Sequence, residues 1–282
     1  MARTAVRKKQ LETDELADMV WAYRHLEHPS FAARLSNLIG SPIEQGFKLL
    51  PKSWYQRLDS AVELSIRKSL DFAIGSMELI TPSSAHMNFH KAMAVGTGAL
   101  GGFFGPITLL AELPVMTVLM LRSIADIAFS EGEDLAQEDA KMACMEVFAL
   151  GGRSTEDDAA ESGYYSIRTV ISFHFSMSPA PPGANSKVLI PASVELIRDI
   201  AARFGVVIKD KAAARMIPVA GAVSGALLNL LFMKHFQDVG RGHFIIRRLE
   251  RKYGSDFIRN MYDRIAQKEA AGNKRYSNLE GW

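Results

Sequence analysis

Hydrophobic and polar positions recur with a helical period along much of the chain. In residues 57–74, hydrophobic and small residues return every three or four positions, and most charged residues lie opposite them. The inward face of this segment comprises Leu58, Val62, Ser65, Ile66, Ser69, Leu70, Ala73 and Ile74. Alternating strand-like runs are scarce, and no Asn-Gly or Asp-Gly hairpin turn occurs. The pattern predicts an all-α protein, folded as a multi-helix bundle.

Two long runs contain no charged residue. They span residues 92–111 and 216–233, and both place small residues four positions apart. Small residues at this spacing share one helix face and allow another helix to approach closely. The residues expected at this contact are Gly98, Gly101, Gly102 and Gly105 in the first run, and Gly221, Gly225 and Asn229 in the second. We expect the two glycine-rich apolar helical segments to pack together as a glycine zipper.

The length of these runs is compatible with more than one role. About 20 apolar residues cross the hydrocarbon core of a bilayer. The first run, however, is rich in glycine and alanine and contains Pro106, which lowers its hydrophobicity. Three interpretations follow: a buried hairpin in a soluble helical protein, insertion into a membrane or its interface, and a glycine-lined pocket for an apolar ligand.

Proline positions suggest how the chain is divided. Pro179, Pro181, Pro182 and Pro191 fall within residues 176–191, which cannot continue a helix. We expect five segments, in which the second half carries the second glycine-rich apolar helix and a basic amphipathic helix. These are an N-terminal helical extension (1–53), the first half of a glycine-rich core (54–175), a proline-rich loop (176–191), the second half (192–270) and a tail (271–282).

Composition and charge exclude several classes of protein. With 48% hydrophobic and 23% charged residues, the chain is globular and not disordered. A single cysteine excludes an intramolecular disulfide framework and a cysteine-rich zinc module. The net charge of +2 gives no reason to expect a nucleic-acid partner. The basic first ten residues are followed by acidic residues and not by an apolar stretch, so we expect a cytoplasmic protein.

Charge is distributed unevenly along the chain. Residues 126–163 contain 11 acidic and 2 basic residues, and residues 209–282 contain 14 basic and 7 acidic residues. Part of the basic excess lies directly after the second uncharged run and is interleaved with apolar residues: Arg241, Arg247, Arg248, Arg251 and Lys252. These cations have two possible uses, contact with an anionic membrane surface or pairing with the acidic stretch.

A small group of charged residues interrupts otherwise apolar sequence. Glu112 stands two positions before Pro114, which we expect to end or kink its helix. Arg122 and Asp126 are four positions apart and can form an ion pair on one helix face. Charges in apolar surroundings are either paired structurally or functional. The functional alternative is a hydrolase in which Glu112 acts as base or ligand and Arg122 anchors an anion.

Evidence for a metal site is weak. His86 and His90 have the i, i+4 spacing of two ligands on one helix face. The glutamate of HExxH is missing between them, and no third ligand is evident. We therefore expect neither a metal nor another cofactor.

Several stretches in a fixed order resemble the bacterial EcsC family. They are glycine-rich residues 94–105, Glu112 to Pro114, Leu121-Arg122 with Ile124-Ala125, Leu150-Gly151-Gly152, and the segment from Ile217 to Gly221 followed by Gly225 and Asn229. The resemblance covers roughly residues 58–252, although the family usually has aspartate where this chain has Glu112. It implies a helical bacterial protein and carries no accepted biochemical activity. Our expectation is a non-enzymatic protein that associates with the inner membrane or with a membrane complex, and its oligomeric state stays open. The alternatives are the hydrolase and a soluble carrier of an apolar ligand.

Overall fold

The computed structural model describes residues 11–27, 31–40, 42–76, 106–152, 163–176, 194–217 and 225–277. Within these residues the chain forms ten helices and no strand, which confirms the all-α prediction. The helices are α1 (Thr13–Glu27), α2 (Phe31–Ile39), α3 (Ile43–Leu49), α4 (Lys52–Ser76), α6 (Pro106–Ser130), α7 (Glu138–Leu150), α8 (Gly163–Ser176), α9 (Val194–Met216), α10 (Gly225–Tyr253) and α11 (Ser255–Ser277).

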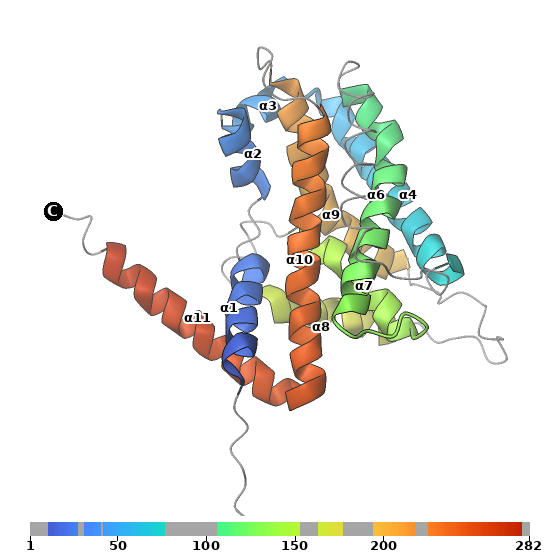
Figure 1. Cartoon of the computed structure of the whole chain (residues 1–282). Coiled ribbons are helices and arrows are strands. Elements are labelled where there is room, and N and C mark those ends of the chain that lie inside the picture. The colour runs from blue at the N-terminus through green and yellow to red at the C-terminus, as the bar shows by residue number, and fades with distance from the viewer. Residues whose placement is uncertain are drawn as a thin grey trace, which may run out of the picture.

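The long helix α10 runs through the bundle (Figure 1), and it packs against α1, α6, α7 and α11. On the other side, α9 contacts α3, α4 and α7. The core between these helices contains a cluster of aromatic rings. Phe148, Phe204 and Phe236 contact one another, and the ring centroid of Phe204 lies 5.1 Å from that of Phe148 and 5.4 Å from that of Phe236. Edge-to-face packing of this kind fills the interior at high density.

The helical face predicted around residues 57–74 is present in α4. Leu58, Val62, Ile66 and Leu70 are buried against the core, while the charged residues between them are exposed. Ser65 is also fully buried, and its hydroxyl donates a hydrogen bond of 2.6 Å to the carbonyl of Ala61 one turn earlier. This bond satisfies the hydroxyl without a partner from another helix.

Of the two effects expected of Pro114, an end or a kink, the structure excludes the end. Helix α6 continues through Pro114 from Pro106 to Ser130. One turn later, the hydroxyl of Thr117 donates to the carbonyl of Leu113, so the polar groups near the proline are paired within the helix. Helix α6 is also the one described helix that is long and apolar enough to cross a membrane, over residues Leu109–Ser130 with a mean hydropathy of 1.5. The most apolar part of that segment is 56% buried inside the fold, while Val115 and Phe129 are about half exposed.

Two glycines after α7 allow close helix packing. A Cβ atom on Gly152 would lie 1.9 Å from the carbonyl oxygen of Arg203 on α9. A Cβ atom on Gly151 would lie 2.5 Å from the ring of Phe236 on α10. The pair therefore marks the end of α7, as its position after Leu150 suggests, and also lets two other helices pack against that end.

Several predicted elements lie outside the described residues. They are Gly98, Gly101, Gly102, Gly105 and Gly221, together with His86, His90 and most of the proline-rich loop. Of the expected zipper, the structure describes Gly225 as the first residue of α10 and Asn229 as a buried residue one turn later. The helices that continue the two runs, α6 and α10, pack against each other.

Candidate functional site

The three residues considered for catalysis are not gathered at one site. All of them lie on α6, where Glu112 and Asp126 are separated by about 21 Å along the helix axis at 1.5 Å per residue. The guanidinium carbon of Arg122 lies 5.9 Å from the centroid of the Phe72 ring on α4. Among the described ion pairs, none joins Arg122 to Asp126. The hydrolase hypothesis required these groups around one pocket and is therefore not supported.

Glu112 instead pairs with a residue that sequence reasoning did not single out. Its carboxylate accepts a hydrogen bond of 2.8 Å from Arg215 on α9, and both side chains are largely buried. One turn before Arg215, Lys211 is fully buried, with its ammonium nitrogen 4.2 Å from the centroid of the Phe232 ring. Burial and the neighbouring Arg215 lower the pKa of Lys211 well below its ordinary value. Glu112, Lys211 and Arg215 thus form a cluster of polar side chains inside the bundle.

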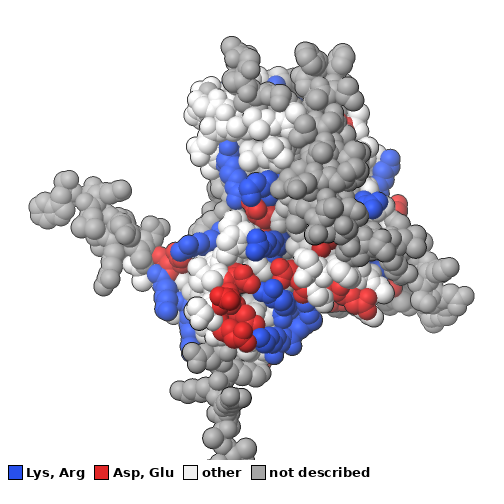
Figure 2. All heavy atoms as spheres, in the orientation of Figure 1, with Lys and Arg blue, Asp and Glu red and all other residues white. Residues whose placement is uncertain are grey.

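This cluster lies near one end of the molecule that we call the charge-poor end. The charge-poor end comprises the C-terminus of α3, the start of α4, and the starts of α6 and α10, which Figure 1 places together at the top. Its exposed apolar side chains include Leu49 on α3 and Leu227 on α10, which are 49% and 36% exposed. Trp54 and Tyr55 at the start of α4 are half-buried beside the core. On the face shown in Figure 2, few charged side chains are visible among the described residues at this end, and the exposed charged residues of α3 and the start of α4 are Glu44, Lys48 and Lys52.

The basic residues after the second uncharged run mostly bind acidic residues of the same chain. Arg241 differs, since its guanidinium lies 4.8 Å from the centroid of the Trp21 ring. The ion pairs are Arg247 with Glu133 (2.8 Å) and Asp139 (2.6 Å), Arg248 with Asp18 (2.6 Å) and Glu131 (2.7 Å), Lys252 with Glu15 (2.7 Å) and Glu12 (3.2 Å), and Arg251 with Glu133. Of the two uses considered for these cations, the structure shows pairing with acidic residues. Arg247, Arg248, Arg251 and Lys252 therefore have acidic partners within the chain, and their contact with a membrane surface stays a prediction.

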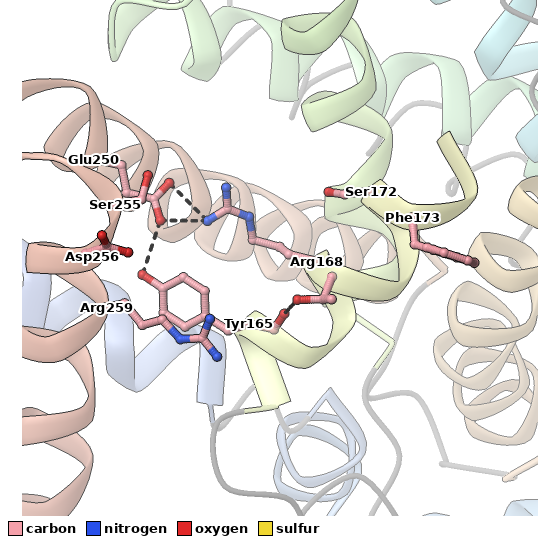
Figure 3. Close-up of a pocket in the computed structure, with 9 residues that line it drawn as sticks. Tyr165, Arg168, Ser172, Phe173, Glu250, Ser255, Asp256 and Arg259 are labelled. Atoms are coloured by element: carbon pink, nitrogen blue, oxygen red, sulfur yellow. Dashed lines mark hydrogen bonds and ion pairs between the residues drawn. The ribbon is translucent and has the colours of Figure 1, made fainter. Parts of the chain in front are cut away.

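A pocket of about 490 Å³ lies at the other end of the bundle, between α8 and the corner where α10 meets α11 (Figure 3). Its charged residues are Arg168 on α8, Glu250 on α10, and Asp256 and Arg259 on α11. Gly254 makes the corner with a φ angle of +91°, a conformation that favours glycine. The turn brings the first residues of α11 against α8.

Arg168 is the most constrained side chain of this pocket. Its Nη1 donates to both carboxylate oxygens of Glu250, at 3.0 and 3.1 Å, and to the hydroxyl of Tyr164 at 3.2 Å. Its guanidinium carbon lies 5.3 Å from the centroid of the Tyr164 ring and 5.8 Å from that of Tyr165. The hydroxyl of Tyr165 donates to Glu250 at 3.2 Å. Figure 3 shows Arg168 and Tyr165 converging on Glu250.

Behind Arg168, a buried polar chain extends into the core. The hydroxyl of Tyr164 lies 3.1 Å from Nδ1 of His243, and Nε2 of that histidine lies 3.5 Å from a carboxylate oxygen of Glu146. Burial raises the pKa of Glu146 to about 7 and lowers that of His243 well below its ordinary value. Burial therefore favours the neutral form of both groups, an imidazole without its second proton and a carboxyl group that keeps its proton to a higher pH than usual.

A second buried carboxylate fixes the walls of the pocket relative to each other. Glu27 on α1 accepts hydrogen bonds from the backbone nitrogen of Tyr164 on α8 and from the hydroxyl of Tyr262 on α11, at 3.2 and 2.9 Å. The rings of Tyr164 and Tyr262 also stack, with centroids 5.6 Å apart. Sequence reasoning missed this site because its residues come from four distant segments and form no local motif.

Comparison with known proteins agrees with the resemblance seen in the sequence. No significant match was found among curated proteins or among solved structures. Residues 19–249 of the 282-residue chain match the EcsC protein family, a region that runs from α1 almost to the end of α10. Because the match covers most of the chain and the resemblance rests on the same residues, the chain belongs to the EcsC protein family.

Proposed function

We propose that this EcsC protein attaches to a membrane surface through its charge-poor end. The observation that carries the proposal is the combination of exposed Leu49 and Leu227 with Trp54 and Tyr55 at one end of the bundle. Apolar side chains enter the boundary between headgroups and acyl chains, and tryptophan and tyrosine favour that boundary. Lys48 and Lys52 are exposed near the same end, where they can contact anionic headgroups.

The arrangement of charge supports the same orientation. At this end, Glu112 and Arg215 pair inside the bundle, so neither would have to be transferred unpaired into an apolar environment. Burial and the neighbouring Glu44 raise the pKa of Asp210, which is also buried on α9, to about 7. Exposed ion pairs between the start of α1 and the end of α10 lie at the opposite end (Figure 1), which would face water. In this proposal the protein binds the membrane surface, and α6 stays in the core of the bundle.

Flotation with lipid vesicles tests the proposal. We expect the full-length protein to float with vesicles that contain phosphatidylglycerol, and Leu227→Asp to reduce the floated fraction several-fold. The matched control is Leu16→Asp on α1, because Leu16 is 40% exposed but lies at the charged end. Circular dichroism and gel filtration establish that each variant is folded and monodisperse.

Three results would contradict attachment to lipid through this end. The first is wild-type protein that stays at the bottom of the gradient with every vesicle composition. The second is an equal loss of flotation for Leu16→Asp and Leu227→Asp. The third is flotation only with native membranes and not with pure lipid, which would replace lipid by a membrane protein complex as the partner.

A further inference from the structure

The pocket between α8 and the α10–α11 corner carries two positive and two negative side chains. Arg168 and Arg259 supply the positive charges, and Glu250 and Asp256 supply the negative ones. A ligand that is purely anionic would meet both carboxylates, and a purely cationic ligand would meet both guanidinium groups. The pocket is therefore complementary to a ligand that carries both signs and has little net charge.

Two of these groups have unused binding capacity. Arg168 makes its described hydrogen bonds to Glu250 and Tyr164 through Nη1, so that Nε and Nη2 donate to no described residue. This free edge presents parallel N–H groups of the kind that bind a carboxylate or a phosphate. The carboxylate of Asp256, in the first turn of α11, forms no ion pair or hydrogen bond with any described residue. Arg168 thus offers two N–H donors on one wall of the pocket. On another wall, Asp256 offers a carboxylate that pairs with no described residue.

The buried chain behind the pocket explains why Arg168 is held so firmly. Tyr164 and His243 are fully buried, and Glu146 is 5% exposed. Placing a carboxyl group, an imidazole and a phenol in the core is costly, and such networks define geometry more than they add stability. Here the network ends on Nη1 of Arg168 and fixes the guanidinium before any ligand arrives. Preorganisation of this kind improves affinity, because less side-chain freedom is lost on binding.

We propose that this pocket binds a small zwitterion, a molecule with one oxyanion group and one ammonium group. The oxyanion binds the free edge of Arg168, and the ammonium binds the carboxylate of Asp256. The exposed ring of Phe173 and the ring of Tyr165 line the same space and accommodate a short apolar portion. A volume of about 490 Å³ suits a metabolite-sized ligand. Amino acids and amino-phosphates have this chemistry.

The test measures binding to the full-length protein by calorimetry and by saturation-transfer NMR, without vesicles. The probes are glycine, L-serine and O-phosphoethanolamine, together with the separate halves of the last, inorganic phosphate and ethanolamine. We expect O-phosphoethanolamine to bind at least about tenfold more tightly than either half, because only the intact molecule meets both charged walls. Since no membrane is present, failure of this test would leave attachment to lipid unaffected.

Two variants separate the proposed contacts. Arg168→Lys keeps a cation beside Glu250 but loses the two-pronged edge, and should weaken binding of O-phosphoethanolamine and phosphate alike by about tenfold. Asp256→Asn should weaken binding of O-phosphoethanolamine by about tenfold and strengthen binding of phosphate. Asp14→Asn is the matched control, since Asp14 is an exposed aspartate in the first turn of α1. Because Asp256 is itself exposed, its variant tests the proposal even if Arg168→Lys proves unstable.

Two outcomes would overturn the proposal. If inorganic phosphate binds as tightly as O-phosphoethanolamine and Asp256→Asn weakens neither, the pocket is a simple anion site. If no zwitterion in the panel binds at millimolar concentration, the pocket has no such ligand.

Discussion

Glu112 on α6 and Arg215 on α9 form a buried ion pair, with 2.8 Å between a carboxylate oxygen and a guanidinium nitrogen. The two residues are 103 positions apart in the sequence. The pair agrees with the structural alternative for Glu112, in which a charge in apolar sequence is paired, and not with the hydrolase alternative, in which Glu112 would join Arg122 and Asp126. It also connects the starting turns of α6 to the last turn of α9 near the charge-poor end. A glutamate in apolar sequence is therefore explained by structure and does not require catalysis.

Removing one partner of this pair should destabilise the protein strongly. We expect Glu112→Ala to lower the free energy of unfolding by about 3–5 kcal/mol, because Arg215 would remain as a buried charge without its partner. Urea denaturation measures the change. The matched control is Glu63→Ala, whose partner Arg67 is four positions away on an exposed helix face, and it should cost less than about 1 kcal/mol. Equal effects of the two substitutions would contradict the assignment.

The basic residues of α10 should affect stability and leave lipid binding unchanged. Arg247 is largely buried between Glu133 and Asp139. We expect Arg247→Met to reduce the free energy of unfolding by about 1.5–3 kcal/mol, because buried Glu133 would lose its hydrogen bonds from Arg247 and keep only Arg251 as a partner. Arg264→Met, at an exposed position on α11, should have little effect. A loss of flotation for folded Arg247→Met would instead indicate that this cation contacts the membrane.

Glu146 should make stability dependent on pH. Its pKa is raised to about 7 in the folded protein from an ordinary value of 4.5, so the folded state retains a proton that the unfolded chain releases. This contribution is fully present below pH 4.5 and is lost as the pH rises through about 7. Glu146→Gln cannot lose a proton, so its stability relative to wild type should rise by roughly 3 kcal/mol between pH 4.5 and pH 8.

Denaturation of wild type and Glu146→Gln at pH 4.5 and pH 8 measures this difference. The pKa of His243 is shifted in the opposite direction, so the pH profile of the wild type alone cannot isolate Glu146. Comparison of the two proteins at each pH cancels the titration that they share. Glu138→Gln, at an exposed position on the same helix, controls for the substitution itself. An identical change in stability at both pH values would contradict the assignment.

The close approach of α9 to the end of α7 should not tolerate a side chain at Gly152. Gly152→Ala would place a Cβ atom 1.9 Å from the carbonyl oxygen of Arg203, so α9 would have to move. We expect a loss of about 2–4 kcal/mol in the free energy of unfolding, similar to other overpacking substitutions. Gly205→Ala, inside α9, meets only an atom 3.8 Å away and should stabilise the helix by about 0.5–1 kcal/mol. Thermal denaturation distinguishes these opposite effects.

The helical fold and the buried face of α4 could be predicted because they depend on local periodicity. Leu58, Val62 and Ile66 repeat at helical spacing, and their burial follows from that repeat. Pro114 misled the prediction because its effect depends on surrounding packing, which overrides a local helix-breaking signal. The family could also be identified, because its motif consists of short segments in a fixed order.

The pocket could not be predicted because no local signal identifies its members. Tyr165 and Arg168 lie on α8, and Asp256 lies on a helix that follows a left-handed corner about 90 positions later.

The partners of Arg247 and Lys252 could be predicted only in part. The acidic stretch after residue 126 supplies Glu133, whereas Glu15 comes from α1, whose position depends on the whole bundle.

The corner at Gly254 has a consequence for variation among relatives. The match to the EcsC family ends at residue 249, so Arg168 lies inside the matched region, while Asp256 and Arg259 lie beyond it. A relative that keeps the bundle but replaces its last helix would retain Arg168 with Tyr164, His243 and Glu146, and would exchange the opposite wall together with Tyr262. For the proposed zwitterion, the contact to the ammonium group can therefore change through the C-terminal segment alone, outside the residues that match the family.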